Sequence, residues 1–205
     1  MSQKEISQFR IALIPGHSSR KRGASNLKNG MTEFEFGMIF VKKLSHLFKV
    51  NKAIKTKVFL RDEKLTTVQG LQFMAADVNK WQAGLCVEFH ANAPGRKNLY
   101  QKVTGNEMLF WNKSDGGNIA ARILSEHVTL ALGNKRRSLK PITKPPSRFD
   151  TRGWPLLYYT RMPCVLVESF FITNDKDLSN ALQKIDELAV KVYEALCKIS
   201  EEFVG

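Results

Sequence analysis

Two histidines and one glutamate each follow a short apolar stretch of the 205-residue chain: His17 after residues 11–14 and a Pro-Gly turn, His90 after residues 85–89, and Glu168 after residues 164–167. Apolar runs of this length predict buried strands. In an open α/β sheet, ligands bind just outside the carboxyl ends of the strands. A single histidine there is commonly a packed residue. Two histidines and a carboxylate at three strand ends are instead typical of a metal-dependent hydrolase.

The third metal ligand is expected at the start of the first helix, where two acids compete for the role. Thr32 and Glu35 have the Ser/Thr-x-x-Glu spacing of a capping box, which accounts for the Glu35 side chain. Glu33 is at the first helical position and is free to reach a metal, although an acid there also stabilises the positive end of the helix. Zinc hydrolases often use two histidines and one carboxylate and leave a fourth position for water. We therefore predict a zinc site made by His17, Glu33 and His90.

The remaining histidines and the cysteines are expected to be structural. His46 and His127 lie in the middle of predicted helices, which indicates surface positions. Cys86, Cys164 and Cys197 form an odd set without a Cys-x-x-Cys pair, so we interpret them as reduced core residues. The sequence contains no His-Glu-x-x-His motif, no phosphate-binding loop and no Gly-x-Gly-x-x-Gly motif. These absences exclude a helix-borne zinc protease site and the common nucleotide-binding motifs.

The composition describes a basic globular chain, with 32 Lys and Arg against 19 Asp and Glu and a net charge of +13. This charge favours an anionic partner, such as nucleic acid, an anionic envelope polymer or a membrane surface, unless it serves only solubility. No apolar run is long enough to span a bilayer, and residues 1–8 lack the apolar core of a signal peptide. We expect a monomer made in the cytoplasm, with residues 1–205 forming one domain and no separate binding domain.

Strands alternate with helices along the chain, which predicts a mostly parallel, open α/β sheet of about six strands flanked by helices. Further strands are expected at 57–60 and, at an edge of the sheet, at 108–111. Helices are expected from Thr32, over 68–78, over 115–132 and, as one long helix, over 178–203. Residues 134–149 are rich in Pro, Lys and Arg, and we interpret them as a long basic loop that either grips an anionic partner or is a solvated insertion.

Six short motifs occur in order along nearly the whole chain: Ile-Pro-Gly-His-Ser-Ser at 14–19, Gly-Ala at 23–24, Glu33 at a helix start, Phe-Leu-Arg at 59–61, Glu-Phe-His-Ala-Asn-Ala at 88–93, and Met-Pro-Cys-Val-Leu-Val-Glu-Ser-Phe-Phe-Ile-Thr-Asn at 162–174. This ordered set resembles the motifs of the zinc-dependent N-acetylmuramoyl-L-alanine amidases of the type 3 family. In that family the first motif reads Asp-Pro-Gly-His-Gly-Gly and the fifth reads Ser-Ile-His-Ala-Asn-Ala. Each motif is weak alone, and the order of the set carries the resemblance.

The resemblance implies a hydrolase of bacterial peptidoglycan that cleaves the amide between the lactyl group of N-acetylmuramic acid and L-alanine of the stem peptide. It implies that His17, Glu33 and His90 bind Zn²⁺ and that Glu168 is the catalytic carboxylate. The residues by themselves agree, because a zinc-bound water needs a positioned base. Without a signal peptide or a wall-binding domain, the expected role is that of a bacteriolytic phage or prophage endolysin, which acts on the cell wall after release from the cytoplasm.

Three departures from the family pattern affect the surroundings of the metal more than its ligands. Ile14 replaces an Asp, residues 18–19 are serines in place of two glycines, and Phe170 replaces a glycine near Glu168. Any further partner that orients His17 must therefore come from elsewhere in the chain.

Two other functions would fit parts of the same sequence. A zinc carboxypeptidase or aminopeptidase acting on free peptides would use the same ligands, whereas a non-catalytic basic module for nucleic acid would leave them unexplained. Glu168 also has a second interpretation, as a buried acid paired with an arginine such as Arg61 or Arg152.

Overall fold

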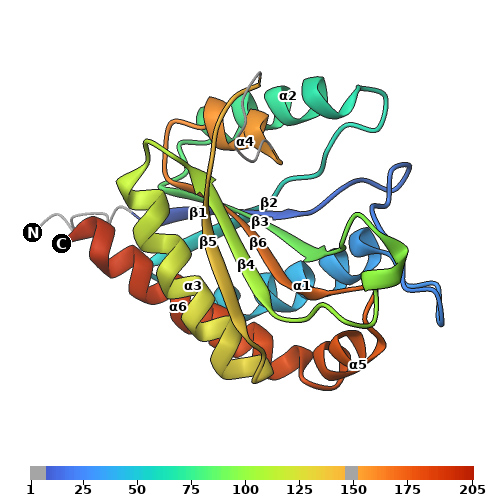
Figure 1. The fold of residues 1–205 in the computed structure, drawn as a ribbon. Helices are drawn as coiled ribbons and strands as arrows, with labels where there is room; N and C mark the ends of the chain where they lie inside the picture. The colour runs from blue at the N-terminus through green and yellow to red at the C-terminus, as the bar shows by residue number, and fades with distance from the viewer. Residues whose placement is uncertain (1–7, 146–151) are drawn as a thin grey trace, which may run out of the picture.

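The computed structural model describes residues 8–145 and 152–205, which contain one six-stranded sheet with the order β2-β1-β3-β6-β4-β5 (Figure 1). The strands are β1 (Phe9–Pro15), β2 (Ile54–Val58), β3 (Leu85–Asn92), β4 (Asn106–Trp111), β5 (Arg136–Ile142) and β6 (Cys164–Phe171). Strands β2, β1, β3 and β6 are parallel, whereas β4 is antiparallel to β6, and β5 is parallel to β4. The prediction of a mostly parallel sheet of about six strands is confirmed.

Helices cover both faces of this sheet (Figure 1). One face carries α1 (Glu33–Leu47), α3 (Asp115–Leu132), α5 (Asp175–Gln183) and α6 (Ile185–Val204), and the other carries α2 (Thr67–Lys80) and α4 (Trp154–Tyr159). Two short 3₁₀ helices lie at Phe48–Val50 and Lys97–Leu99. None of the described helices is long and apolar enough to cross a membrane.

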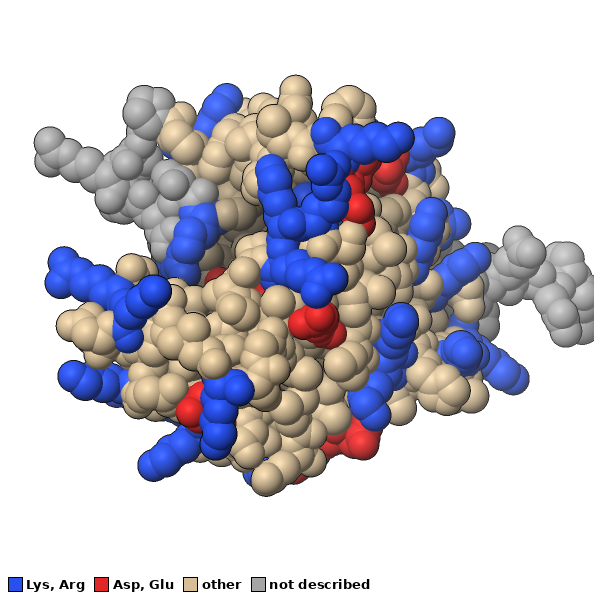
Figure 2. All heavy atoms as spheres, turned by 90° about the vertical axis from the view of Figure 1, so that its right-hand side faces the viewer, with Lys and Arg blue, Asp and Glu red and all other residues tan. Residues whose placement is uncertain are grey.

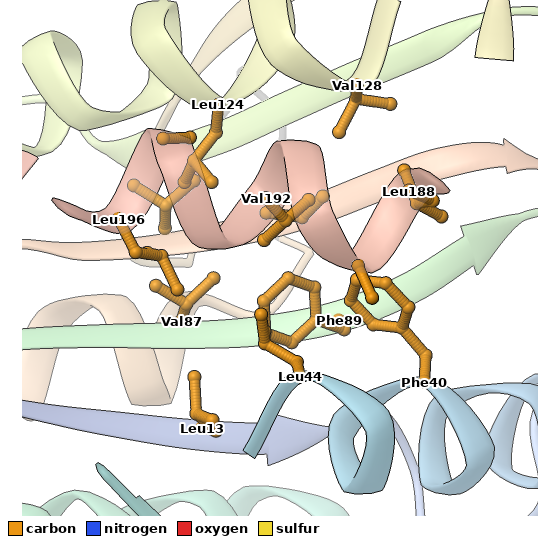
Figure 3. Close-up of a cluster of buried hydrophobic side chains, with 14 of the residues drawn as sticks. Leu13, Phe40, Leu44, Val87, Phe89, Leu124, Val128, Leu188, Val192 and Leu196 are labelled. Atoms are coloured by element: carbon orange, nitrogen blue, oxygen red, sulfur yellow. The ribbon is translucent and has the colours of Figure 1, made fainter. Parts of the chain in front are cut away.

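The larger part of the core lies where α1, α3 and α6 meet the central strands. Figure 3 shows Phe40 of α1 against Phe89 of β3, with Val192 of α6 beside them. The two rings lie edge to face with centroids 5.0 Å apart, an arrangement that aromatic pairs prefer. Strands β1, β3 and β6 are almost wholly buried, because helices cover both of their faces. Their continuous apolar sequences therefore follow from a central position in the sheet.

The segment 134–149 was wrongly predicted to be a loop. Residues 136–142 form the outermost strand, β5, and this strand places β4 inside the sheet instead of at the predicted edge. Residues 146–149 lie outside the described residues. The physical reason is that an edge strand tolerates Lys, Arg and Pro, because one side of its backbone faces solvent. Basic residues and Pro141 therefore fit a strand that the composition suggested was a loop.

The C-terminal helix was predicted as one element but is two. Helix α5 ends at Gln183, and Lys184 has a non-helical backbone (φ −104°, ψ 18°) before α6 begins. The Lys184 ammonium donates to the carbonyl of Ala131 at the end of α3, 3.1 Å away. The apolar stripe continues across the break, so periodicity alone did not reveal it. The short helix α4 was not predicted, although Gly153 in the left-handed region and Pro155 mark its start.

Strand order brings three predicted site residues to one end of the sheet. Strand β3 lies between β1 and β6, with Pro15 opposite Phe89 and His90 opposite Glu168. Because the three strands are parallel, their carboxyl ends share one edge. The His17 turn, His90 and Glu168 therefore become neighbours although 151 positions separate the first from the last.

Candidate functional site

The three predicted metal ligands lie together, with both histidines in contact with the carboxylate of Glu33. Glu33 Oε2 lies 3.0 Å from His17 Nε2 and 3.2 Å from His90 Nδ1. One ligand atom from each residue lies within 4.8 Å of the other two. Glu33 is buried, and both histidines are half-buried. Two imidazole nitrogens and one carboxylate oxygen are the donor set of catalytic zinc sites, so these residues fit such an ion.

Two glycines allow the histidine rings to approach the rest of the site. A Cβ at Gly16 would lie 2.6 Å from the His90 ring, and a Cβ at Gly23 would lie 2.4 Å from the His17 ring. Gly23 also has φ +79°, a conformation that favours glycine. His17 itself has φ +68°, which is uncommon for a residue with a side chain. The loop after β1 is therefore shaped around the positions of the two imidazoles.

The two acids at the start of α1 have the separate roles that their spacing predicted. Glu35 Oε2 accepts from the backbone N–H of Thr32 at 2.9 Å, and the Glu35 N–H donates to Thr32 Oγ1 at 3.3 Å, so the capping box is confirmed. Glu33 turns the other way: its Oε1 accepts from the Ala24 N–H at 2.7 Å, and its Oε2 faces the histidines. Binding of a metal by this set stays a prediction.

Glu168 lies beside the histidine cluster in β6. It is buried, it stands opposite His90 in β3 and Glu107 in β4, and its Oε2 has no hydrogen-bond partner among the described residues. Burial raises the pKa of Glu168 to about 7; the charges of Glu33 and Glu107 add to this, and those of His90 and Arg152 oppose it. A carboxyl group with such a pKa can both take and give a proton near neutrality.

The alternative interpretation of Glu168, as a buried acid paired with an arginine, agrees with the structure only in part. Arg152 Nη1 lies 3.9 Å from Glu168 Oε1, a long contact, and Arg152 is exposed. Arg61, the other candidate, pairs with Glu88 instead. Glu168 therefore keeps one oxygen directed to the site.

Two buried acids near the site were missed from the sequence. Glu88 contacts His90 Nε2 through Oε2 at 3.4 Å. Burial raises the pKa of Glu88, but His90, Arg61 and His17 outweigh it and hold the pKa at about 2. The available signal was strand alternation, which puts Glu88 on the same face as His90, two residues later.

Glu107 in β4 is the second missed acid, and it is surrounded by cations. Its carboxylate lies 3.0 Å from Arg137 Nε, 3.2 Å from Lys140 Nζ and 3.4 Å from Arg152 Nη2, and it accepts from Asn92 Nδ2 at 3.1 Å. Burial raises its pKa, but these cations outweigh burial and lower the pKa below its usual value. The signal was an acid directly before the apolar run 108–111, but only the pairing of β4 with β6 puts Glu107 beside Glu168.

The ligands, Glu88 and Glu168 line one cavity of about 360 Å³, together with cationic side chains that include Lys21, Arg61 and Arg152. Figure 2 looks onto this side of the molecule, where Lys and Arg outnumber Asp and Glu. His46 is exposed at the end of α1, and His127 is half-buried in α3. Cys86 and Cys164 are buried, Cys197 is partly buried, and all three are free thiols, as expected.

Comparison with known proteins assigns the chain to a family. Residues 11–198 match the family model described as N-acetylmuramoyl-L-alanine amidase. The chain belongs to this family. The predicted family and its enzyme class, an amide hydrolase, are therefore confirmed, whereas zinc dependence stays a prediction.

Relatives of known sequence or structure agree with this amidase assignment. The N-acetylmuramoyl-L-alanine amidase LytC of Bacillus subtilis (strain 168) is 27% identical over 188 residues, which is 90% of this chain and 34% of LytC. The chain thus spans about a third of the length of that relative.

Solved amidase structures share the fold. An N-acetylmuramoyl-L-alanine amidase from Clostridium difficile 630 superposes with a TM-score of 0.79 at 20% identity, covering 95% of this chain and 97% of that one. The catalytic domain of CD27L, an endolysin targeting Clostridia difficile, gives 0.75 at 22% identity, covering 93% and 98%.

The first prediction separates the metal ligand from the helix cap in the amidase site. Glu33→Ala should lose the metal, because it removes the carboxylate that both histidines share. Glu35→Ala should keep the metal and lose about 1 kcal/mol of unfolding free energy, since only a capping interaction is removed. Metal content by elemental analysis and denaturant unfolding measure the two effects. If the effects were exchanged between the variants, the assignment of ligand and cap would be reversed.

The second prediction concerns the stability of the metal-free protein. The raised pKa of Glu168 means that its proton stabilises the folded state below about pH 4.5, and that this contribution is lost as the pH rises through about 7. The glutamine of Glu168→Gln cannot ionise. As the pH rises from acidic to mildly alkaline, the unfolding free energy of the variant should therefore increase relative to that of wild type, on the order of 1–3 kcal/mol. Thermal unfolding with a chelator present measures this difference, and a difference independent of pH would contradict it.

Proposed function

We propose that this chain is a zinc-dependent amidase that cleaves the bond between the lactyl group of N-acetylmuramic acid and L-alanine of the peptidoglycan stem peptide. The observation that carries the proposal is the convergence of His17, Glu33 and His90 beside Glu168 in one cavity. Membership of the amidase family supports the assignment of the bond that is cleaved. A zinc ion held by the three ligands would lower the pKa of a water to about 7 and polarise the scissile carbonyl.

In this mechanism Glu168 moves the proton. Its Oε2 is buried without a hydrogen-bond partner among the described residues, so it is available to accept a proton from the attacking water and to deliver it to the leaving amine of L-alanine. Opposing influences set its pKa, because burial raises it and a cation on the neighbouring ligands would lower it. We therefore expect an ionised base at neutral pH.

We further propose that the chain acts as an endolysin of a phage or prophage. The likeness to the catalytic domain of the CD27L endolysin supports this role, and so does the basic surface, which suits an anionic envelope. The cations that line the cavity continue this surface to the site itself, so the same charge can bring the enzyme to the wall and hold anionic parts of the substrate.

Mass spectrometry of muropeptides released from purified cell walls tests the reaction. We expect stem peptides with a free L-alanine amino terminus, a loss of this product with a chelator, and its recovery with zinc. Glu168→Gln should lower the rate on the order of a hundred- to ten-thousand-fold while keeping its metal, because the amide has the shape of the base but takes no proton. Release of terminal amino acids with the lactyl amide intact would instead indicate a carboxypeptidase or aminopeptidase. A Glu168→Gln protein without metal would make Glu168 a ligand.

Electrostatic attraction to the wall has its own test. Glu168→Gln protein should sediment with purified cell walls at about 0.05 M salt and be released at about 0.5 M. The reason is that the distance over which charges attract falls below about 10 Å when the salt concentration exceeds 0.1 M. Binding that does not change over this range would contradict attraction by the net charge of +13 and favour a dedicated saccharide pocket.

A further inference from the structure

One buried ion pair beside the metal ligands has no part in the proposed reaction. Glu88 Oε1 lies 3.0 Å from Arg61 Nη2, and the two side chains are only 1% and 7% exposed. Removing two charges from water costs free energy that their mutual attraction often does not recover. Stability alone is therefore a weak reason for this pair, and its position next to a ligand indicates another.

The second oxygen of Glu88 faces the outer nitrogen of His90. Oε2 lies 3.4 Å from His90 Nε2, whereas His90 Nδ1, on the other side of the ring, lies 3.2 Å from Glu33 Oε2. A neutral imidazole carries a hydrogen on one nitrogen and a lone pair on the other. The group that accepts the hydrogen bond from the protonated nitrogen therefore decides that the other nitrogen binds the metal. His90 Nε2 is buried and has no aligned hydrogen bond among the described residues, so Glu88 is the acceptor next to it.

We propose that Glu88, held by Arg61, is a positioning residue for His90. Glu88 Oε2 accepts the Nε2–H of His90, which leaves the lone pair of Nδ1 for the metal and fixes the plane of the ring. The separation of 3.4 Å is longer than an aligned charge-assisted bond of about 2.8 Å, and we expect it to shorten when the metal is bound. This inference rests on the proposed function, because it requires His90 to be a ligand.

The fold makes room for this support. Arg61 follows β2 and reaches Glu88 past helix α2, where a Cβ on Gly70 would lie 2.9 Å from Arg61 Cγ and 3.2 Å from its Cδ. The missing side chain at Gly70 thus leaves a passage for the arginine. Arg61 in turn holds Oε1 of Glu88, so Oε2 is the oxygen left for His90. Glu88 therefore accepts from His90 Nε2, on the side of the ring opposite to Glu33.

Zinc affinity and the tautomer of His90 test the inference, and neither readout needs the reaction. Zinc affinity is measured by competition with a chromophoric chelator, and the tautomer by nitrogen NMR of zinc-loaded protein with labelled histidine. Glu88→Gln keeps an acceptor and should weaken zinc binding less than Glu88→Leu, for which we expect a loss of about 10- to 100-fold. The His90 Nε2–H signal should shift in both variants.

A double variant separates positioning from stability. Arg61→Met with Glu88→Leu removes both buried charges and leaves neither unpaired, so the protein should fold. It should still lose zinc affinity by about 10- to 100-fold, because His90 has lost its acceptor. Glu107→Gln is the matched control: it neutralises another buried acid that touches none of the three ligands, and its zinc affinity should equal that of wild type.

Two results would overturn the inference in distinguishable ways. Wild-type zinc affinity and an unchanged His90 signal in the double variant would show that the pair is only structural, and would leave the proposed function intact. A wild-type protein that binds no metal would overturn the proposed function and this inference with it.

Discussion

A carboxylate buried between two imidazole rings is the interaction on which this site depends. Glu33 Oε2 is within 3.2 Å of both His17 Nε2 and His90 Nδ1, and a backbone N–H holds its other oxygen. Such a cluster is stable only if its charges are balanced, because buried ions lose their hydration. Burial works against the charged form of Glu33, yet hydrogen bonds and charges from the two histidines bring its pKa down to about 2. The loop after β1 and the start of α1 are both shaped to keep these three groups together.

Charge balance extends outward from Glu33 to three further buried acids. Glu88 is matched by Arg61, and Glu107 by Arg137, Lys140 and Arg152. Among the described residues, the one cation that contacts Glu168 is Arg152, at 3.9 Å, and Glu168 is the acid whose pKa is raised. The group proposed to carry the proton is therefore the least compensated of the four. Uneven pairing of similar carboxyl groups is a physical means of giving neighbouring acids different roles at one site.

The reversal of strand direction at β4 contributes to this pattern. Because β4 is antiparallel to β6, residues near its amino end, not its carboxyl end, lie beside the site. Glu107 thereby comes opposite Glu168, and the edge strand β5 supplies Arg137 and Lys140 to Glu107. The basic segment predicted to be a loop is thus partly a strand whose cations neutralise a buried acid, in addition to contributing to the basic surface.

Features that depend on residues close together in the chain could be predicted from the sequence. Apolar runs marked β1, β3 and β6, and a three-residue spacing separated Glu35 as the cap from Glu33 as the candidate ligand. Tertiary structure alone decided which strands are neighbours and which acids share the cavity, because strand pairing joins segments that are distant in sequence. Glu88 and Glu107 were therefore missed: alternation along the strand puts Glu88 on the face of His90, but only the pairing of β3 and β4 with β6 shows that these acids lie beside the site. The edge strand β5 was missed for the same reason, since its basic residues are explained only by the partner strand β4 on one side and solvent on the other.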